Sequence, residues 1–207
     1  MSNLEGITNN ETRIPAIIFR RSSFVIRISS FRSGASFTII ELLVVIAIII
    51  ILGSLILSTV GYVQKKGARS RAEAEIAAMS AALESYKADN GIYPRDTATT
   101  DAVDARAAID FSKYQTASQY LYGQLAADAD FDGVPDTSSK SYMQFKPNQL
   151  GKDANGKLYL RDPFGNSYGY STAYQSNAST GYNPTYDLWS TAGATSGTNQ
   201  AQWIKNW

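Results

Sequence analysis

The chain has 207 residues, with 19 Lys or Arg and 18 Asp or Glu, so its formal net charge at pH 7 is only +1. This balance gives no electrostatic basis for binding nucleic acid. Cysteine and histidine are both absent, which excludes disulfides, thiol nucleophiles, Cys/His metal sites and histidine-based acid–base catalysis. Because no spacing of carboxylates nominates a catalytic pair, we predict that the protein is not an enzyme.

The first 36 residues carry more basic than acidic side chains and are too few to bury a core of their own. Their charged residues are Arg13, Arg20, Arg21, Arg27, Arg32, Glu5 and Glu11. Basic residues beside an apolar segment favour the cytoplasmic side of a membrane. We therefore expect residues 1–36 to be a leader peptide that is cleaved and contributes nothing to the fold.

A long apolar run follows, with one acidic residue near its start. From Leu42 to Gln64 no residue is charged, and a helix of that length, at about 1.5 Å per residue, crosses a bilayer core. A charge inside hydrocarbon costs roughly 2.5–3.5 kcal/mol on insertion scales, so Glu41 needs a partner. We predict that residues 37–64 form the transmembrane half of a helix and that Glu41 is functional.

The motif Phe-Thr-Ile-Ile-Glu-Leu-Leu-Val-Val-Ile-Ala-Ile, which begins at Phe37, resembles the mature N-terminus of the type IV pilin superfamily. In that family a prepilin peptidase cuts before the Phe, the new amine is N-methylated, and a Glu stands fifth after the cut, as Glu41 does here. The resemblance implies cleavage between Ser36 and Phe37, although the family has Gly at the position of Ser36. Cutting after Gly34 would spoil the register of Glu41. The resemblance also implies that Glu41 pairs with the amine of Phe37 from another subunit during assembly.

The helix is predicted to continue beyond the apolar run, because strong helix formers follow and apolar residues recur every three to five positions. This stripe consists of Val63, Ala68, Ala72, Ile76, Met79, Leu83 and Tyr86. Gly91 supplies a C-cap and Pro94 forbids continuation. We expect residues 65–91 to be an amphipathic half that packs on the exported domain. Gly53 and Gly61 have two possible interpretations, local melting of the apolar half of the helix or close packing against another helix, and the sequence does not decide between them.

The remainder, residues 92–207, is expected to be the exported globular domain. The fold class is therefore α+β and pilin-like, with a long N-terminal helix packed on a small antiparallel β-sheet domain. An insertion spans about residues 95–159 and is predicted to hold helices over 99–109 and 112–125 and a strand around 142–145. Acidic residues of this region that we expect to face solvent are Asp101, Asp104 and Asp110.

The segment Arg-Asp-Pro-Phe-Gly-Asn-Ser-Tyr-Gly-Tyr, which begins at Arg161, is typical of a hairpin, in which alternating tyrosines start the second strand. Its turn-forming residues, expected to be structural, are Asp162, Pro163, Gly165 and Asn166. The segment resembles the Asp-Pro-Trp-Gly-Asn-Pro-Tyr-x-Tyr hairpin of the major pseudopilin of type II secretion systems. A predicted strand around Tyr186–Ser190 and a terminal Trp207, expected to plug the core, resemble later parts of that family.

The loop that binds calcium in the resembled family follows its Ser-x-Gly strand and supplies aspartates and backbone carbonyls. Here the corresponding residues 191–203 contain no Asp or Glu. Because calcium usually needs carboxylate ligands, we predict that this site is lost and that hydrogen bonds from Ser, Thr and Asn hold the loop.

The insertion contains a second candidate calcium site. Residues 128–136 match the first half of a calcium loop, with carboxylates at alternate positions, Gly at the sixth and another Asp at the ninth. The expected Ca²⁺ ligands are Asp128, Asp130, Asp132 and Asp136. Ser139 stands where an EF-hand carries its bidentate Glu, so a solvated acidic turn remains the alternative.

The resemblance implies a structural subunit of a type II secretion pseudopilus. Such a subunit crosses the bacterial inner membrane once with its C-terminal domain in the periplasm, and it forms a periplasmic helical filament that drives protein export. The implied partners are further copies of the chain, minor pseudopilins, the prepilin peptidase, the inner-membrane assembly platform and secreted proteins. The alternative is a type IV pilus subunit for adhesion or motility. A membrane-anchored binding module that does not assemble would have no need of Glu41.

Overall fold

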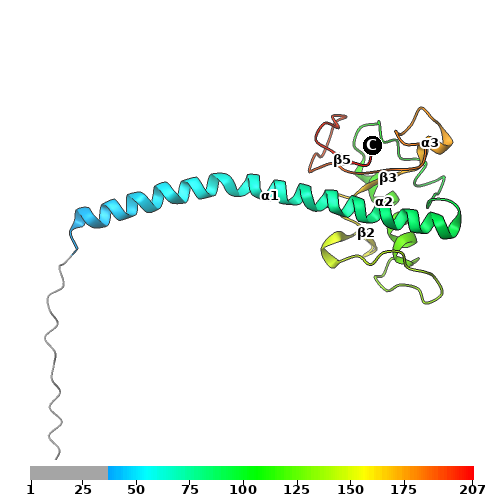
Figure 1. The fold of residues 1–207 in the computed structure, drawn as a ribbon, viewed down its shortest axis with the longest axis horizontal. Coiled ribbons are helices and arrows are strands. Elements are labelled where there is room, and N and C mark those ends of the chain that lie inside the picture. Colours follow the sequence, from blue (N-terminus) through cyan, green and yellow to red (C-terminus); the bar gives the residue numbers. More distant parts are fainter. Residues whose placement is uncertain (1–36) are drawn as a thin grey trace, which may run out of the picture. The chain divides into compact units, whose positions relative to one another are not determined.

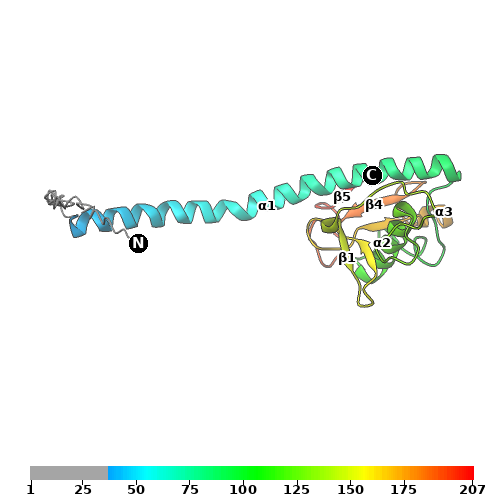
Figure 2. The same ribbon diagram turned by 90° about the horizontal axis from the view of Figure 1, so that it is seen from below.

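The computed structural model describes residues 37–207, and Figures 1 and 2 show its ribbon. The expected leader, residues 1–36, lies outside the described residues, as does Ser36 before the expected cut. Contacts divide the chain into a unit that ends at Ile49 and a larger unit, Ile50–Trp207.

One helix, α1, runs from Ile39 to Asn90. At its start the Thr38 Oγ1 accepts a hydrogen bond from the Glu41 amide at 3.2 Å, which satisfies one of the amides left free in a first turn. At its end Gly91 has φ +80° and its amide donates to the Lys87 carbonyl at 2.7 Å, so the predicted glycine cap is confirmed. By length and composition α1 can cross a membrane.

In the unit that ends at Ile49, every described residue is exposed. This part of α1 is apolar except for Glu41. A helix that is apolar all round has to be covered by lipid or by other helices.

In the larger unit, the second part of α1 lies along the domain (Figures 1 and 2). The α1 residues buried there are Ala72, Ile76, Met79, Ala82 and Leu83. The predicted stripe is thus confirmed at Ala72, Ile76, Met79 and Leu83, whereas the buried Ala82 lies outside it. The stripe begins later than predicted, because Val63 remains 64% exposed and the domain covers the helix only from about Ala68.

Helix α2 spans Phe111–Ala126, as predicted for residues 112–125. Its N-cap carboxylate, Asp110, accepts hydrogen bonds from the Ser112 and Lys113 amides at 3.1 and 3.3 Å, the usual role of Asp at this position. Ala127, with φ 58°, ends the helix in the left-handed region.

The helix predicted over residues 99–109 is wrong, because this segment forms turns and irregular backbone. The Asp96 carboxylate accepts from the Ala98 and Thr99 amides at 3.1 and 2.8 Å, and the Asp104 carboxylate accepts from the Arg106 amide at 2.8 Å. Such local side-chain bonds offer the backbone an alternative to a helix.

Within residues 37–207, five short strands form two antiparallel sheets. β1 (Leu150–Lys152) pairs with β2 (Leu158–Leu160). In the second sheet β4 (Asp187–Ser190) lies between β3 (Gly169–Ser171) and β5 (Ile204–Lys205). The remaining elements are a 3-10 turn, η1 (Pro147–Gln149), and a short helix, α3 (Ala173–Ser176).

The strand predicted around residues 142–145 is wrong. The Tyr142 and Met143 amides both donate to the Leu125 carbonyl, at 2.8 and 3.0 Å. This segment therefore caps the end of α2 instead of pairing with a strand.

The predicted hairpin turn is confirmed. One Asp162 oxygen accepts from the Phe164 and Asn166 amides at 3.0 and 2.8 Å, and Gly165 takes φ +95°. A bridge between Arg161 and Ser167 closes the turn. Burial raises the pKa of Asp162, against the effect of these hydrogen bonds. The carboxylate holds the turn together, as expected for a structural residue.

The core consists of two clusters. The larger joins the buried face of α1 to α2 and to the inner residues of both sheets, including Leu160, Tyr170 and Leu188. The smaller surrounds Trp189 and contains Tyr114 and Trp203. Trp207, expected as a core plug, is half-buried at its edge, with its ring 5.7 Å from Trp189.

Candidate functional site

The start of α1 carries the two residues predicted to act in assembly. Phe37 is 76% exposed, and Glu41 lies exposed in the first helical turn. A carboxylate in this turn interacts favourably with the positive end of the helix dipole. Sequence reasoning missed the cap at Thr38, although the Thr-x-x-Glu spacing of a capping box signals it.

The acidic loop after α2 brings together three of its four predicted calcium ligands. Carboxylate oxygens of Asp128, Asp130 and Asp132 all lie within 4.8 Å of one another. The fourth, Asp136, is not part of this group. Its carboxylate accepts from the Ala129 amide at 3.0 Å, and its own amide donates to the Ala127 carbonyl at 2.6 Å, so Asp136 closes the loop.

Asp128 is fully buried and organises the loop from within. It accepts hydrogen bonds from the Tyr122 hydroxyl at 2.7 Å, the Gly133 amide at 2.8 Å and the Asp132 amide at 3.2 Å. Burial raises the pKa of Asp128, but the bonds from Tyr122 and Gly133 outweigh it and the net pKa is lowered. Asp128 is thus held ionised.

The pKa of the neighbouring carboxylate, Asp130, shifts in the opposite direction. Its hydrogen-bond interaction with Asp128 raises the pKa of Asp130, as expected where two acids share a small space. A hard divalent cation such as Ca²⁺ prefers oxygen ligands and would neutralise the charge of these neighbouring carboxylates. Gly133, at φ +101°, permits the turn that directs the carboxylates toward one another. The donor set therefore fits Ca²⁺.

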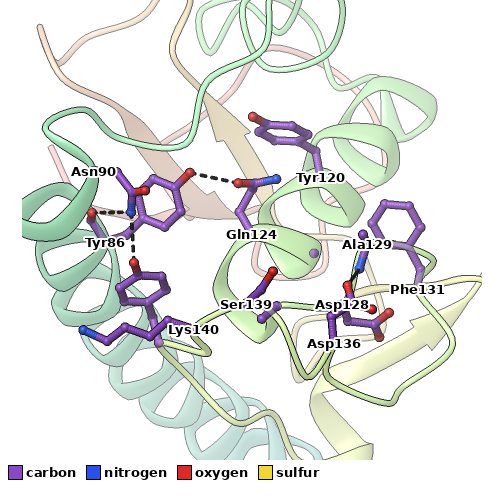
Figure 3. Close-up of a pocket in the computed structure, with 13 residues that line it drawn as sticks. Tyr86, Asn90, Tyr120, Gln124, Asp128, Ala129, Phe131, Asp136, Ser139 and Lys140 are labelled. Carbon is purple, nitrogen blue, oxygen red and sulfur yellow. Dashed lines mark hydrogen bonds between the residues drawn. The ribbon is translucent and has the colours of Figure 1, made fainter.

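A cavity of about 440 Å³ lies beside this loop. Figure 3 shows Asp128, Ala129 and Asp136 on one side of it and Tyr86 and Asn90 of α1 on the other. Four of the polar side chains that line it bond to one another in pairs. The Tyr86 hydroxyl donates to the side-chain Oε1 of Gln124 at 2.9 Å, and the side-chain amide of Asn90 donates to the Tyr142 hydroxyl at 2.9 Å. The first bond joins α1 to α2, and the second joins α1 to the segment that follows the acidic loop.

The loop at residues 191–203 is held by hydrogen bonds of the predicted kind. The Thr191 hydroxyl donates to the Ala194 carbonyl at 2.8 Å, and the Asn166 amide group of the hairpin donates to the Thr191 hydroxyl at 3.0 Å. Asn199 accepts from the Ala201 amide at 3.0 Å. The loss of the family's calcium site from this loop stays a prediction.

A helix able to span a membrane that continues into a small antiparallel-sheet domain defines a pilin-like protein. Within that class, residues 59–132 match the family model of type II secretion system protein G, the major pseudopilin. The match begins beyond Phe37 and Glu41 and covers the amphipathic half of α1, α2 and the start of the acidic loop. The chain is therefore similar to the type IV pilin superfamily and most like its type II secretion pseudopilins. Searches of curated proteins and of solved structures returned no match.

Proposed function

We propose that the chain is a structural subunit of a type II secretion pseudopilus, a helical filament that drives protein export. The match of residues 59–132 to the protein G family is the observation that carries this proposal. The exposed apolar part of α1 supports it, because such a surface needs other helices or lipid around it. Identical subunits that meet through two different surfaces form an open helix when the rotation does not close.

Assembly in this proposal depends on the start of the mature chain. A prepilin peptidase cuts between Ser36 and Phe37, and the new amine is methylated. The ammonium group of an incoming subunit then neutralises Glu41 of its neighbour. Since an unpaired charge in hydrocarbon is unfavourable, subunits settle only where these two groups meet.

The cellular setting follows from the same proposal. The subunit crosses the bacterial inner membrane once, and its C-terminal domain lies in the periplasm. Its partners are further copies, minor pseudopilins, the inner-membrane assembly platform and the secreted proteins. A separate ATPase supplies the energy, because this role requires no catalysis by the subunit itself.

Processing gives the most direct test. Coexpression of the full chain with a prepilin peptidase should yield a mature protein that begins with N-methylated Phe37, and this product alone should form filaments. N-terminal sequencing and intact mass would show the cut and the methyl group, and electron microscopy of sheared material would show the filaments. Filaments built from unprocessed chains, or from chains that begin at Ala35, would contradict the proposal. Surface pili under native expression would favour the type IV pilus alternative.

We also propose that the acidic loop binds Ca²⁺ through Asp128, Asp130 and Asp132. Two features favour this over a merely solvated turn: the carboxylate oxygens converge within 4.8 Å, and the buried Asp128 is held ionised by its hydrogen bonds. The ion would fasten the acidic loop to the end of α2. Its role would be structural.

Calcium should therefore raise the melting temperature of the full chain after chelator treatment. Binding to the folded state alone stabilises by about 2.7 kcal/mol at a hundredfold excess over the dissociation constant. Asp130→Asn should abolish this increment, and thermal unfolding followed by circular dichroism would measure it. Asp136→Asn is the matched control: it lies in the same loop but outside the cluster, so it should keep the increment. No calcium-linked shift in the unsubstituted chain would remove the proposal.

A further inference from the structure

A cluster of cations follows the apolar run of α1 directly. Its members, here called the basic collar, are Lys65, Lys66, Arg69 and Arg71. No acidic residue stands between Glu41 and Glu73. From Lys65 to Arg71 the helix rises about 9 Å at 1.5 Å per residue, slightly more than the roughly 5–8 Å of one polar headgroup layer. The collar thus begins where a helix that spans the hydrocarbon would enter the headgroups.

Most of this charge is not neutralised by the protein. Lys65, Lys66 and Arg71 are exposed, and none takes part in an ion pair within residues 37–207. Arg69 differs, because it pairs with Glu73 at 3.1 Å and donates to the Gln202 carbonyl at 2.9 Å. Arg69 therefore fixes the loop that contains Gln202 beside the collar.

Membrane topology gives no reason for these cations. Lys and Arg beside a membrane span favour the cytoplasmic side, so four of them at the end of α1 that enters the exported domain oppose the proposed orientation. Each Lys or Arg near a bilayer surface strengthens association with anionic lipid about fivefold. The collar is continuous along α1 with the apolar run, so in a membrane-anchored chain Lys65 and Lys66 would lie next to lipid headgroups, which can supply negative charge.

We propose that the basic collar binds the phosphate groups of anionic phospholipids in the leaflet from which α1 emerges. Lys65 and Lys66 make the main contacts, because they are closest to the apolar run and free of protein partners. Bound lipid would hold the subunit at a fixed depth in the membrane. The same contacts would have to break when a subunit leaves the bilayer, so anionic lipid would oppose its extraction. The proposal depends on membrane anchoring and not on filament assembly.

Lipid selectivity measured by electron spin resonance tests this. The full chain is reconstituted in phosphatidylcholine vesicles with traces of spin-labelled phosphatidylglycerol or spin-labelled phosphatidylcholine. The motionally restricted fraction of each label reports how strongly that lipid associates with the protein. Phosphatidylglycerol should be preferred severalfold, and added salt should weaken the preference, because salt screens exposed charges. The double variant Lys65→Gln/Lys66→Gln should lower the preference clearly, and what remains should come from Arg71 and the leader arginines.

The matched control is Lys146→Gln/Lys152→Gln, which removes the same charge from exposed positions on the domain. It should keep the preference, and the leader arginines are identical in all variants, so the difference isolates the collar. Unchanged selectivity in the collar variant would overturn the proposal, as would an equal loss in the control. A collar variant that keeps its lipid selectivity but fails to assemble would assign these cations to contacts between copies instead.

Discussion

Gly169→Ala should destabilise the exported domain severely. Gly169 lies opposite Trp189 across the β3–β4 pair, and a methyl group there would lie 2.1 Å from Cε2 and 2.3 Å from Cζ2 of the indole ring. The ring has no room to retreat, because Trp189 is fully buried between Tyr114, with ring centroids 5.2 Å apart, and Trp203, at 6.0 Å. Overpacking a core costs about 1–3 kcal/mol and occasionally more, and we expect the upper end. Denaturant unfolding followed by tryptophan fluorescence would measure the loss.

Two other glycines serve as controls for this prediction. A methyl group at Gly151 would also clash, at 2.4 Å, but with the far end of the half-buried Tyr159 ring, which can swing away. Gly151→Ala should therefore cost much less. Gly67 in α1 has open space around it, so Gly67→Ala should stabilise the helix by up to about 1 kcal/mol. Equal stability losses at Gly169 and Gly151 would show that ring burial does not decide the cost.

The sequence predicts best those elements that depend on nearby residues. α1 ends at its glycine cap, α2 begins at Phe111, one residue before the predicted start, and the Asp162 turn forms, because each depends on contacts within about one turn of chain. The N-cap role of Asp110 is not among the predictions. The same locality explains the acidic loop. Alternating aspartates and a glycine at the sixth position suffice to bring Asp128, Asp130 and Asp132 together, whereas Asp136 is drawn away by the Ala129 amide.

The sequence predictions fail where residues distant in the sequence determine the surroundings of a side chain. Asp101 is expected to face solvent, yet its side chain is 4% exposed and lies 2.8 Å from the Arg95 guanidinium. It also accepts from the Thr172 hydroxyl at 2.6 Å, a residue that no local pattern connects with it. The partner of Gly169 across the sheet is likewise set by register, which the glycine itself does not reveal.

Glu41→Ala should leave a membrane-inserted subunit that does not form filaments. Removal of an acid from the first turn weakens a helix by only about 0.3–1 kcal/mol, which the 52 residues of α1 can absorb. In the proposed filament, however, the amine of an incoming Phe37 would then be buried without its partner, at about 3–5 kcal/mol for each contact. Association should weaken by roughly a hundredfold or more, since about 1.4 kcal/mol is a factor of ten. Membrane fractionation and electron microscopy of sheared filaments would measure the two effects.

The effect of losing the charge of Glu41 must be distinguished from the effect of losing a helix cap, because Glu41 also occupies the capping-box position relative to Thr38. Glu41→Gln keeps the size and hydrogen-bonding capacity of the side chain and removes only its charge, so it should fail to assemble as Glu41→Ala does. Thr38→Ala removes the cap, at a cost of about 1 kcal/mol, and keeps the charge, so it should still assemble. If Glu41→Gln assembled normally while Thr38→Ala did not, the carboxylate would serve the start of its own helix and the proposed pairing with Phe37 would be wrong.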